Sequence, residues 1–117
     1  MSDITLDELA GRLGGVDLVD VRSTAEFDGS GGKPCDPRQG HIPGARHLDL
    51  YELMAMCLSD VHEQLGLEAG AEIVAYCHSG SRSAIAAQAL RSLGYDARNY
   101  VGSWHEWSRH DDLPIER

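Results

Sequence analysis

The stretch EIVAYCHSGSRSAIAAQALRSLG, residues 72–94, decides the fold of this chain. Residues 73–76 form an uninterrupted apolar run, which is typical of a strand buried on both faces of a parallel sheet. Residues 78–81, His-Ser-Gly-Ser, predict a small polar turn. Residues 83–93 place alanine and leucine on one helical face, which predicts a helix. The stretch therefore predicts that a strand, a turn and a helix meet at Cys77.

The segments on either side continue the same alternation of strands and helices. Further strands are predicted at residues 18–21, 45–48 and 97–101. Helices are predicted at residues 6–13, behind a capping box of Thr5 and Glu8, at 50–58, at 61–65 with Ser59 as N-cap, and at 104–109. Residues 28–44, rich in glycine and proline, predict a long loop. This pattern predicts an α/β fold whose central, mostly parallel sheet carries helices on both faces and binds ligands beyond the carboxyl ends of its strands.

Composition and charge limit the possible functions. A length of 117 residues, 42% of them hydrophobic, predicts one domain over residues 1–117. Ten basic and 19 acidic residues give a net charge of −9, which disfavours nucleic-acid binding. No apolar run approaches the ~20 residues of a membrane helix, and residues 1–6 do not resemble a signal peptide. Three widely spaced cysteines fit a reducing compartment, so we expect a cytoplasmic protein with free thiols.

Cys77 is the candidate nucleophile. A loop of small residues before a helix can turn its amides toward the sulfur, and the helix N-terminus adds a positive dipole. Such surroundings lower a cysteine pKa from ~8.5 to as little as ~3.5–7.5. Arg82 offers a permanent charge suited to an oxyanion, and further hydroxyl donors come from Ser79, Ser81 and Ser83. The alternatives are a buried structural thiol at Cys77, a surface arginine at Arg82, and for His78 either a general base or an exposed loop residue.

Several motifs together resemble the rhodanese-homology family. LVDVR at residues 18–22, EF at 26–27 and GHIPGA at 40–45 are similar to its first signature, and YCHSGSRS at 76–83 is similar to its active-site loop. The tail, with GY at 94–95, NYVGSWHEW at 99–107 and LPIE at 113–116, resembles the end of the catalytic half of two-domain thiosulfate and mercaptopyruvate sulfurtransferases. The loop at residues 28–39 also suits that subgroup.

This resemblance implies a rhodanese-like fold and a sulfurtransferase activity. Cys77 would take a sulfane sulfur from a small anionic donor such as thiosulfate, become a persulfide, and pass the sulfur to cyanide or another thiophile. The resemblance also implies donor binding by His78, Ser79, Gly80, Ser81 and Arg82. Asp20 and Arg22 would support the site, or form a purely structural ion pair. No cofactor, metal, nucleic acid or membrane partner is implied.

Two departures from the subgroup bear on the donor. The 117 residues hold no counterpart of the inactive second half of the two-domain enzymes, so we expect a more open cleft or one completed by another molecule. The chain also has Glu26 where some members carry an arginine, which is unfavourable for a small anion. The loop does not match the CGSGVT pattern of the mercaptopyruvate enzymes, so thiosulfate is the preferred donor.

Other functions compete with this interpretation. A cysteine phosphatase would place five residues between its cysteine and arginine, whereas four separate Cys77 from Arg82. A regulatory or persulfide-relay module with a protein partner is the non-enzymatic alternative. Cys35 could be a second thiol in such a relay, although an incidental exposed cysteine is the simpler interpretation. Cys57 is expected in the core, and Trp104 and Trp107 are expected to pack rather than to bind a ligand.

Overall fold

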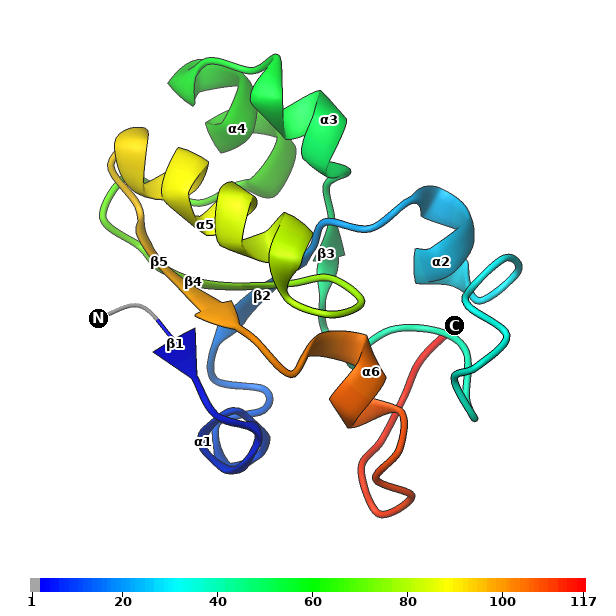
Figure 1. The fold of residues 1–117 in the computed structure, drawn as a ribbon. Helices are drawn as coiled ribbons and strands as arrows, with labels where there is room; N and C mark the ends of the chain where they lie inside the picture. The colour runs from blue at the N-terminus through cyan, green and yellow to red at the C-terminus, as the bar shows by residue number, and fades with distance from the viewer. Residues whose placement is uncertain (1–2) are drawn as a thin grey trace.

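The protein is described by a computed structural model in which residues 3–117 are placed. The strands form one sheet in the order β1-β5-β4-β2-β3, and every pairing is parallel. Their bounds are β1 Asp3–Ile4, β2 Asp17–Asp20, β3 Arg46–His47, β4 Glu72–Tyr76 and β5 Asp96–Tyr100. The predicted α/β architecture is confirmed, and the strand that precedes Cys77 lies in the middle of the sheet (Figure 1).

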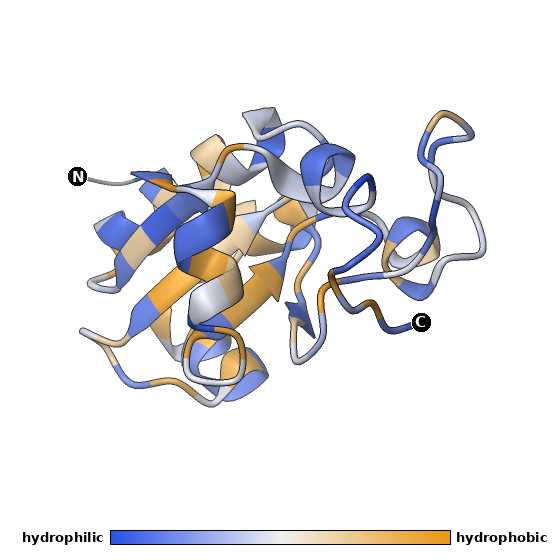
Figure 2. Cartoon of the chain, turned by 90° about the horizontal axis from the view of Figure 1, so that it is seen from below, coloured by the Kyte–Doolittle hydropathy of each residue, from blue (hydrophilic) through white to orange (hydrophobic). Residues whose placement is uncertain are grey.

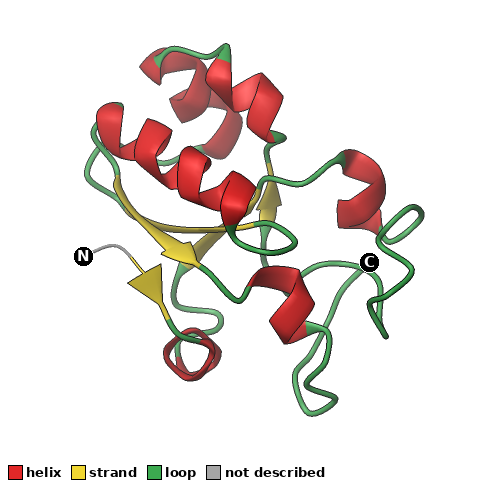
Figure 3. Cartoon of the chain, viewed as in Figure 1, coloured by secondary structure: helices red, strands yellow, loops and turns green. Residues whose placement is uncertain are grey.

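Helices cover both faces of this sheet, as Figures 1 and 3 show. Their bounds are α1 Leu6–Gly11, α2 Thr24–Asp28, α3 Leu50–Met54, α4 Leu58–Leu65, α5 Ser81–Ser92 and α6 Ser103–Trp107. One face carries α3, α4 and α5, and the other carries α1 and α6. Helix α2 lies beyond the carboxyl end of β2, near the C-terminus of the chain. This arrangement is the one that alternating strands and helices predict.

Two separate hydrophobic clusters hold the layers together, because neighbouring residues of a strand face opposite sides of the sheet. Val19, Ile73 and Ala75 pack beneath α3, α4 and α5. Leu18 and Val74 face the other way, toward α1 and α6. Figure 2 shows the hydrophobic strands at the centre of the molecule. Trp104 and Trp107 are completely buried in the second cluster, so their predicted packing role is confirmed.

Two short elements are absent from the sequence-based prediction. Strand β1 has only two residues and pairs with the edge of β5. Helix α2 lies just before the predicted loop and begins with a capping box in which Ser23 accepts from the amide of Glu26 and the Glu26 carboxylate accepts from the amide of Ser23. Serine followed three residues later by glutamate is a recognisable helix start, so the sequence did hold this signal.

The prediction for Cys57 and Ser59 is wrong. Helix α4 begins at Leu58 with Cys57 as its N-cap, and Cys57 is exposed rather than in the core. Its thiol contacts the Asp60 carboxylate at 3.3 Å and the Ser59 hydroxyl at 3.1 Å. The apolar residues around it suggest a continuous buried helix, but the chain breaks between α3 and α4, and the break turns Cys57 outward.

The helices of residues 3–117 are short. Among them, none is long and apolar enough to cross a membrane.

Candidate active site

The carboxyl ends of two neighbouring strands define the site. β2 and β4 pair in parallel register, with Asp20 opposite Tyr76. The next residues along the two strands therefore leave the sheet at the same edge, and these include Arg22 and Cys77. Helix α5 starts four residues after Cys77 and aims its N-terminus back at this edge. The topology thus places a helix N-terminus over a thiol, as the sequence predicts.

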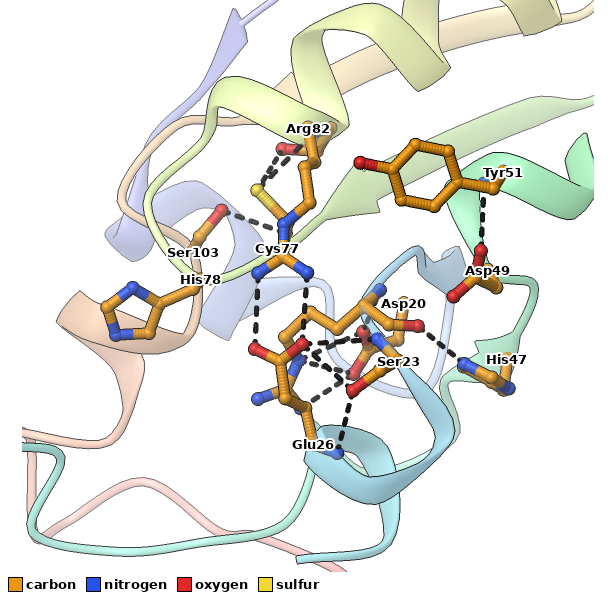
Figure 4. A network of polar contacts seen from close by, with 12 residues as sticks. Asp20, Ser23, Glu26, His47, Asp49, Tyr51, Cys77, His78, Arg82 and Ser103 are labelled. Atoms are coloured by element: carbon orange, nitrogen blue, oxygen red, sulfur yellow. Dashed lines mark hydrogen bonds and ion pairs between the residues drawn. The ribbon is translucent and has the colours of Figure 1, made fainter. Parts of the chain in front are cut away.

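Three hydrogen-bond donors lie close to the Cys77 sulfur, which Figure 4 shows beside Arg82. The amide of Gly80 lies 3.1 Å from Sγ, and the amide of Ser83 lies 3.4 Å from it. The Ser83 hydroxyl donates to the same sulfur at 3.3 Å. Cys77 itself has no exposed surface. A buried sulfur with three donors is an environment built for a negative charge, because a neutral thiol needs none of them.

These contacts act on the acidity of Cys77 in opposite directions. Burial raises the pKa of the Cys77 thiol, because it removes water from the thiolate. Hydrogen bonds from Ser83, Gly80 and Ser79 lower the pKa by a larger amount, and the net result is a pKa below the ordinary value. The site therefore favours the thiolate, which is the nucleophilic form of cysteine.

The backbone of the loop depends on a glycine and on α6. Gly80 adopts a φ of +92°, and a Cβ there would meet the carbonyl oxygen of Val101 at 2.5 Å. The Ser103 hydroxyl accepts from the amide of Cys77 at 3.1 Å and donates to the carbonyl of Tyr100 at 2.7 Å. The amides of Trp104 and His105 donate to the carbonyls of Cys77 and His78, each at 2.9 Å. The start of α6 thus fixes the strand end and the turn.

Arg82 is not free to bind an oxyanion in this structure. Its guanidinium points toward α2 and makes two hydrogen bonds to Glu26, Nη1 to Oε1 at 2.9 Å and Nη2 to Oε2 at 3.1 Å (Figure 4). The fork geometry matches both carboxylate oxygens, which is the strongest form of this pair. The sequence analysis expects the Arg82 guanidinium to bind the sulfur donor. In the structure this guanidinium is instead paired with the Glu26 carboxylate.

Asp20 and Arg22 form a second ion pair, buried beneath the first. Both residues are at most 1% exposed, and Arg22 Nη2 lies 2.7 Å from Asp20 Oδ2. Arg22 also donates to the carbonyl of Gly40 at 2.6 Å, so it joins the strand end to the long loop. The guanidinium stacks over Trp104, with its carbon 5.1 Å from the ring centroid. These contacts fit the structural ion pair, which is one of the two roles that the sequence analysis gives to Asp20 and Arg22.

His78 points away from the sulfur toward a carboxylate that sequence reasoning did not predict. Its Nε2 lies 3.0 Å from Oδ2 of Asp36, a buried residue of the long loop. Arg109 Nη1 donates to the other oxygen of Asp36 at 2.9 Å. Cys35, Asp36 and His78 place three potential metal ligands within 4.8 Å of one another. Arg109 already supplies the positive charge that this carboxylate needs, so the cluster is balanced without a metal ion.

The structure brings together only part of the predicted site. Gly80 contributes an amide to the sulfur cradle, and Arg82 stands beside it with Glu26. Among the hydrogen bonds of residues 3–117, no side-chain hydroxyl except that of Ser83 reaches the Cys77 sulfur, and Ser79 acts on Cys77 through its backbone amide. Ser103 and Asp36 were not predicted, because no local motif marks a residue that reaches the site from another part of the chain.

The hydroxyl of Ser83 provides a test of the cradle. Ser83→Ala removes one donor to the thiolate, so the pKa of Cys77 should rise and the thiolate fraction at neutral pH should fall. The rate of Cys77 alkylation by iodoacetamide, measured against pH, should move to higher pH. Ser92→Ala, at the other end of α5, is the matched control and should keep the wild-type profile. Coincident profiles for Ser83→Ala and the wild type would contradict the role of this hydroxyl.

The family comparison agrees with this geometry. A model of the rhodanese-like domain matches residues 5–110. The thiosulfate sulfurtransferase of Azotobacter vinelandii is 36% identical over 94% of this chain and 44% of its own length. A putative thiosulfate sulfurtransferase of Haloferax volcanii is 38% identical over 88% of this chain and 41% of its own. The chain thus spans less than half the length of these curated relatives.

Solved structures show the same likeness. The crystal structure of a probable thiosulfate sulfurtransferase superposes with a TM-score of 0.85 at 46% identity, over 98% of this chain and 47% of that one. An anaerobic ergothioneine biosynthesis enzyme from Chlorobium limicola, in complex with trimethyl histidine, gives a TM-score of 0.88 at 25% identity, over 99% of this chain and 28% of that one. The family model over residues 5–110, together with these relatives, shows that the chain belongs to the rhodanese-like domain family.

Proposed function

We propose that this protein is a sulfurtransferase that moves a sulfane sulfur through a persulfide on Cys77. With thiosulfate as donor, the Cys77 thiolate attacks the outer sulfur, a new S–S bond forms, and the bond between the two sulfurs of thiosulfate breaks. Sulfite leaves with the electron pair of that bond, and the enzyme keeps a persulfide anion. A thiophile such as cyanide then attacks the outer sulfur of the persulfide, leaves as thiocyanate and regenerates the thiolate.

The donor set around the Cys77 sulfur carries this proposal. Two amides and a hydroxyl at 3.1–3.4 Å stabilise an anionic sulfur before the reaction starts. The loop also presents several amides within one turn, and such a nest of amides can bind the outer, negatively charged sulfur once it has been transferred. The names of the relatives support thiosulfate as a donor.

Phosphoryl transfer fits the same loop less well. A phosphate in a cysteine phosphatase needs a loop with five residues between cysteine and arginine, and needs the arginine to hold two phosphate oxygens. This chain has four residues in that interval, and both ends of the Arg82 fork are bound by Glu26. The shorter ring suits a single sulfur atom better than a tetrahedral phosphate.

Mass spectrometry of the intact protein tests the proposal. After incubation with thiosulfate and removal of excess donor, we expect the mass of the wild-type protein to increase by one sulfur atom. Cyanide should remove this sulfur and yield one equivalent of thiocyanate. A parallel incubation with an aryl phosphate should give no turnover. Hydrolysis of the phosphate without any sulfur uptake from thiosulfate would overturn the assignment in favour of a phosphatase.

A further inference from the structure

We propose that Glu26 determines donor specificity, by making the site favour sulfur donors with one negative charge over donors with two. The proposal rests on the sulfurtransferase function above, because it concerns the donor that loads Cys77. The Glu26 carboxylate binds Arg82, the one arginine among residues 76–83 of the Cys77 loop.

The pair is fixed rather than transient. The Glu26 side chain is only 10% exposed, and four hydrogen bonds reach its carboxylate: two from Arg82, one from the Ser23 hydroxyl and one from the Ser23 amide. Burial raises the pKa of Glu26, but hydrogen bonds from Arg82 and Ser23 lower it by a larger amount. The resulting pKa of Glu26 is about 2. The carboxylate is therefore fully charged at any pH at which a cysteine thiolate reacts.

Two other arginines near the loop are also paired with carboxylates. Arg22 is paired with Asp20, and Arg109 is paired with Asp36. Lys33 lines a hollow of about 290 Å³ next to Glu26, but this lysine is exposed, so solvent screens its charge. A donor at Cys77 is thus bound mainly by uncharged amides, in the field of a carboxylate and an overall charge of −9.

Charge compensation affects donors in proportion to their charge. At a separation of about 6 Å and an effective dielectric constant of about 40, one unit charge changes affinity by about tenfold. The Glu26 charge therefore weakens the binding of a donor with one charge about tenfold and that of a donor with two charges about a hundredfold. Removing the Glu26 charge should raise the affinity for the doubly charged donor about tenfold more than the affinity for the singly charged donor.

Two donors separate this effect from reactivity. Thiosulfate carries two charges and methanethiosulfonate carries one, because a methyl group replaces one anionic oxygen. Both lose their outer sulfur to Cys77 through the same S–S cleavage, and the leaving groups are sulfite and methanesulfinate. Their intrinsic reactivities differ, so the informative quantity is the ratio of their kcat/KM values for persulfide formation, compared between variants.

The test is Glu26→Gln, which keeps the shape of the side chain and removes its charge. We expect the ratio of thiosulfate to methanethiosulfonate kcat/KM to rise about tenfold, mostly through a lower KM for thiosulfate. Glu63→Gln removes an equal charge from an exposed site on α4, and should leave the ratio unchanged. Ser23→Ala weakens the same capping box but keeps the Glu26 charge, and should also leave the ratio unchanged.

Each outcome has one meaning. A ratio that stays constant in Glu26→Gln, or rises equally in Glu63→Gln, overturns the specificity role while the sulfurtransferase function stands. An equal rise of the kcat/KM ratio in Ser23→Ala also overturns the specificity role. The rise would then come from a change in α2 and not from the loss of the Glu26 charge. If neither donor places sulfur on Cys77 of the wild-type protein, both the proposed function and this inference fail.

Discussion

Cys77→Ala is expected to abolish sulfur transfer completely. The sulfur of Cys77 is the atom on which the loop amides and the Ser83 hydroxyl converge. Alanine leaves these hydrogen-bond donors in place and removes the atom that forms the new bond. After treatment with thiosulfate the variant should keep its original intact mass, and cyanide should release no thiocyanate.

Cys57→Ala is the matched control for this experiment. Cys57 is an exposed thiol at the N-cap of α4, on a helix that covers the sheet rather than the loop. The control should gain and lose one sulfur atom as the wild type does. Thermal unfolding of both variants establishes that each is folded. Uptake of one sulfur by folded Cys77→Ala, with release by cyanide, would show that another residue is the nucleophile.

Arg22→Met is expected to destabilise the fold strongly. It leaves the Asp20 carboxylate buried, with no exposed surface and without its counter-ion, and it removes the donor to the carbonyl of Gly40. Loss of one partner of a buried pair typically costs about 3–5 kcal/mol of unfolding free energy. Chemical denaturation should show this loss as a lower midpoint with an unchanged slope.

Arg46→Met provides the comparison for that measurement. Arg46 binds Asp17 at 2.9 Å between β3 and β2, but both side chains are about two-fifths exposed. Exposed pairs contribute about 0–1 kcal/mol, since water competes for both charges. Equal destabilisation by Arg22→Met and Arg46→Met would contradict the structural role assigned to the buried pair.

The fold could be read from the sequence because its determinants are local. Residues 72–94 encode the strand, the turn and the helix in one stretch, and each depends on neighbours in sequence: an apolar run, then small residues, then a helical period. The parallel order follows from the alternation of elements. The thiolate at Cys77 is equally local, because its donors Gly80 and Ser83 lie within six residues of it.

The charges of the site are the part that sequence reasoning could not place. Glu26 and Arg82 are 56 residues apart, and their contact depends on how α2 is set against the start of α5. Asp36 reaches His78 and Arg109 from a loop whose composition predicts no position for its side chains. Cys57 was misplaced for a related reason: an apolar neighbourhood indicates burial only while the helix continues, and at this point it stops.

Because α6 holds the turn after β4 in place, residues 72–94 alone are not expected to rebuild the Cys77 loop in another protein. Hydrogen bonds hold this turn against Ser103, whose φ is +54°, and against the first amides of α6. A graft of residues 72–94 into another parallel sheet would carry Cys77 and α5 but would lack these contacts from α6. Engineering a sulfur carrier from this domain therefore requires the segment after β5 to move together with the loop.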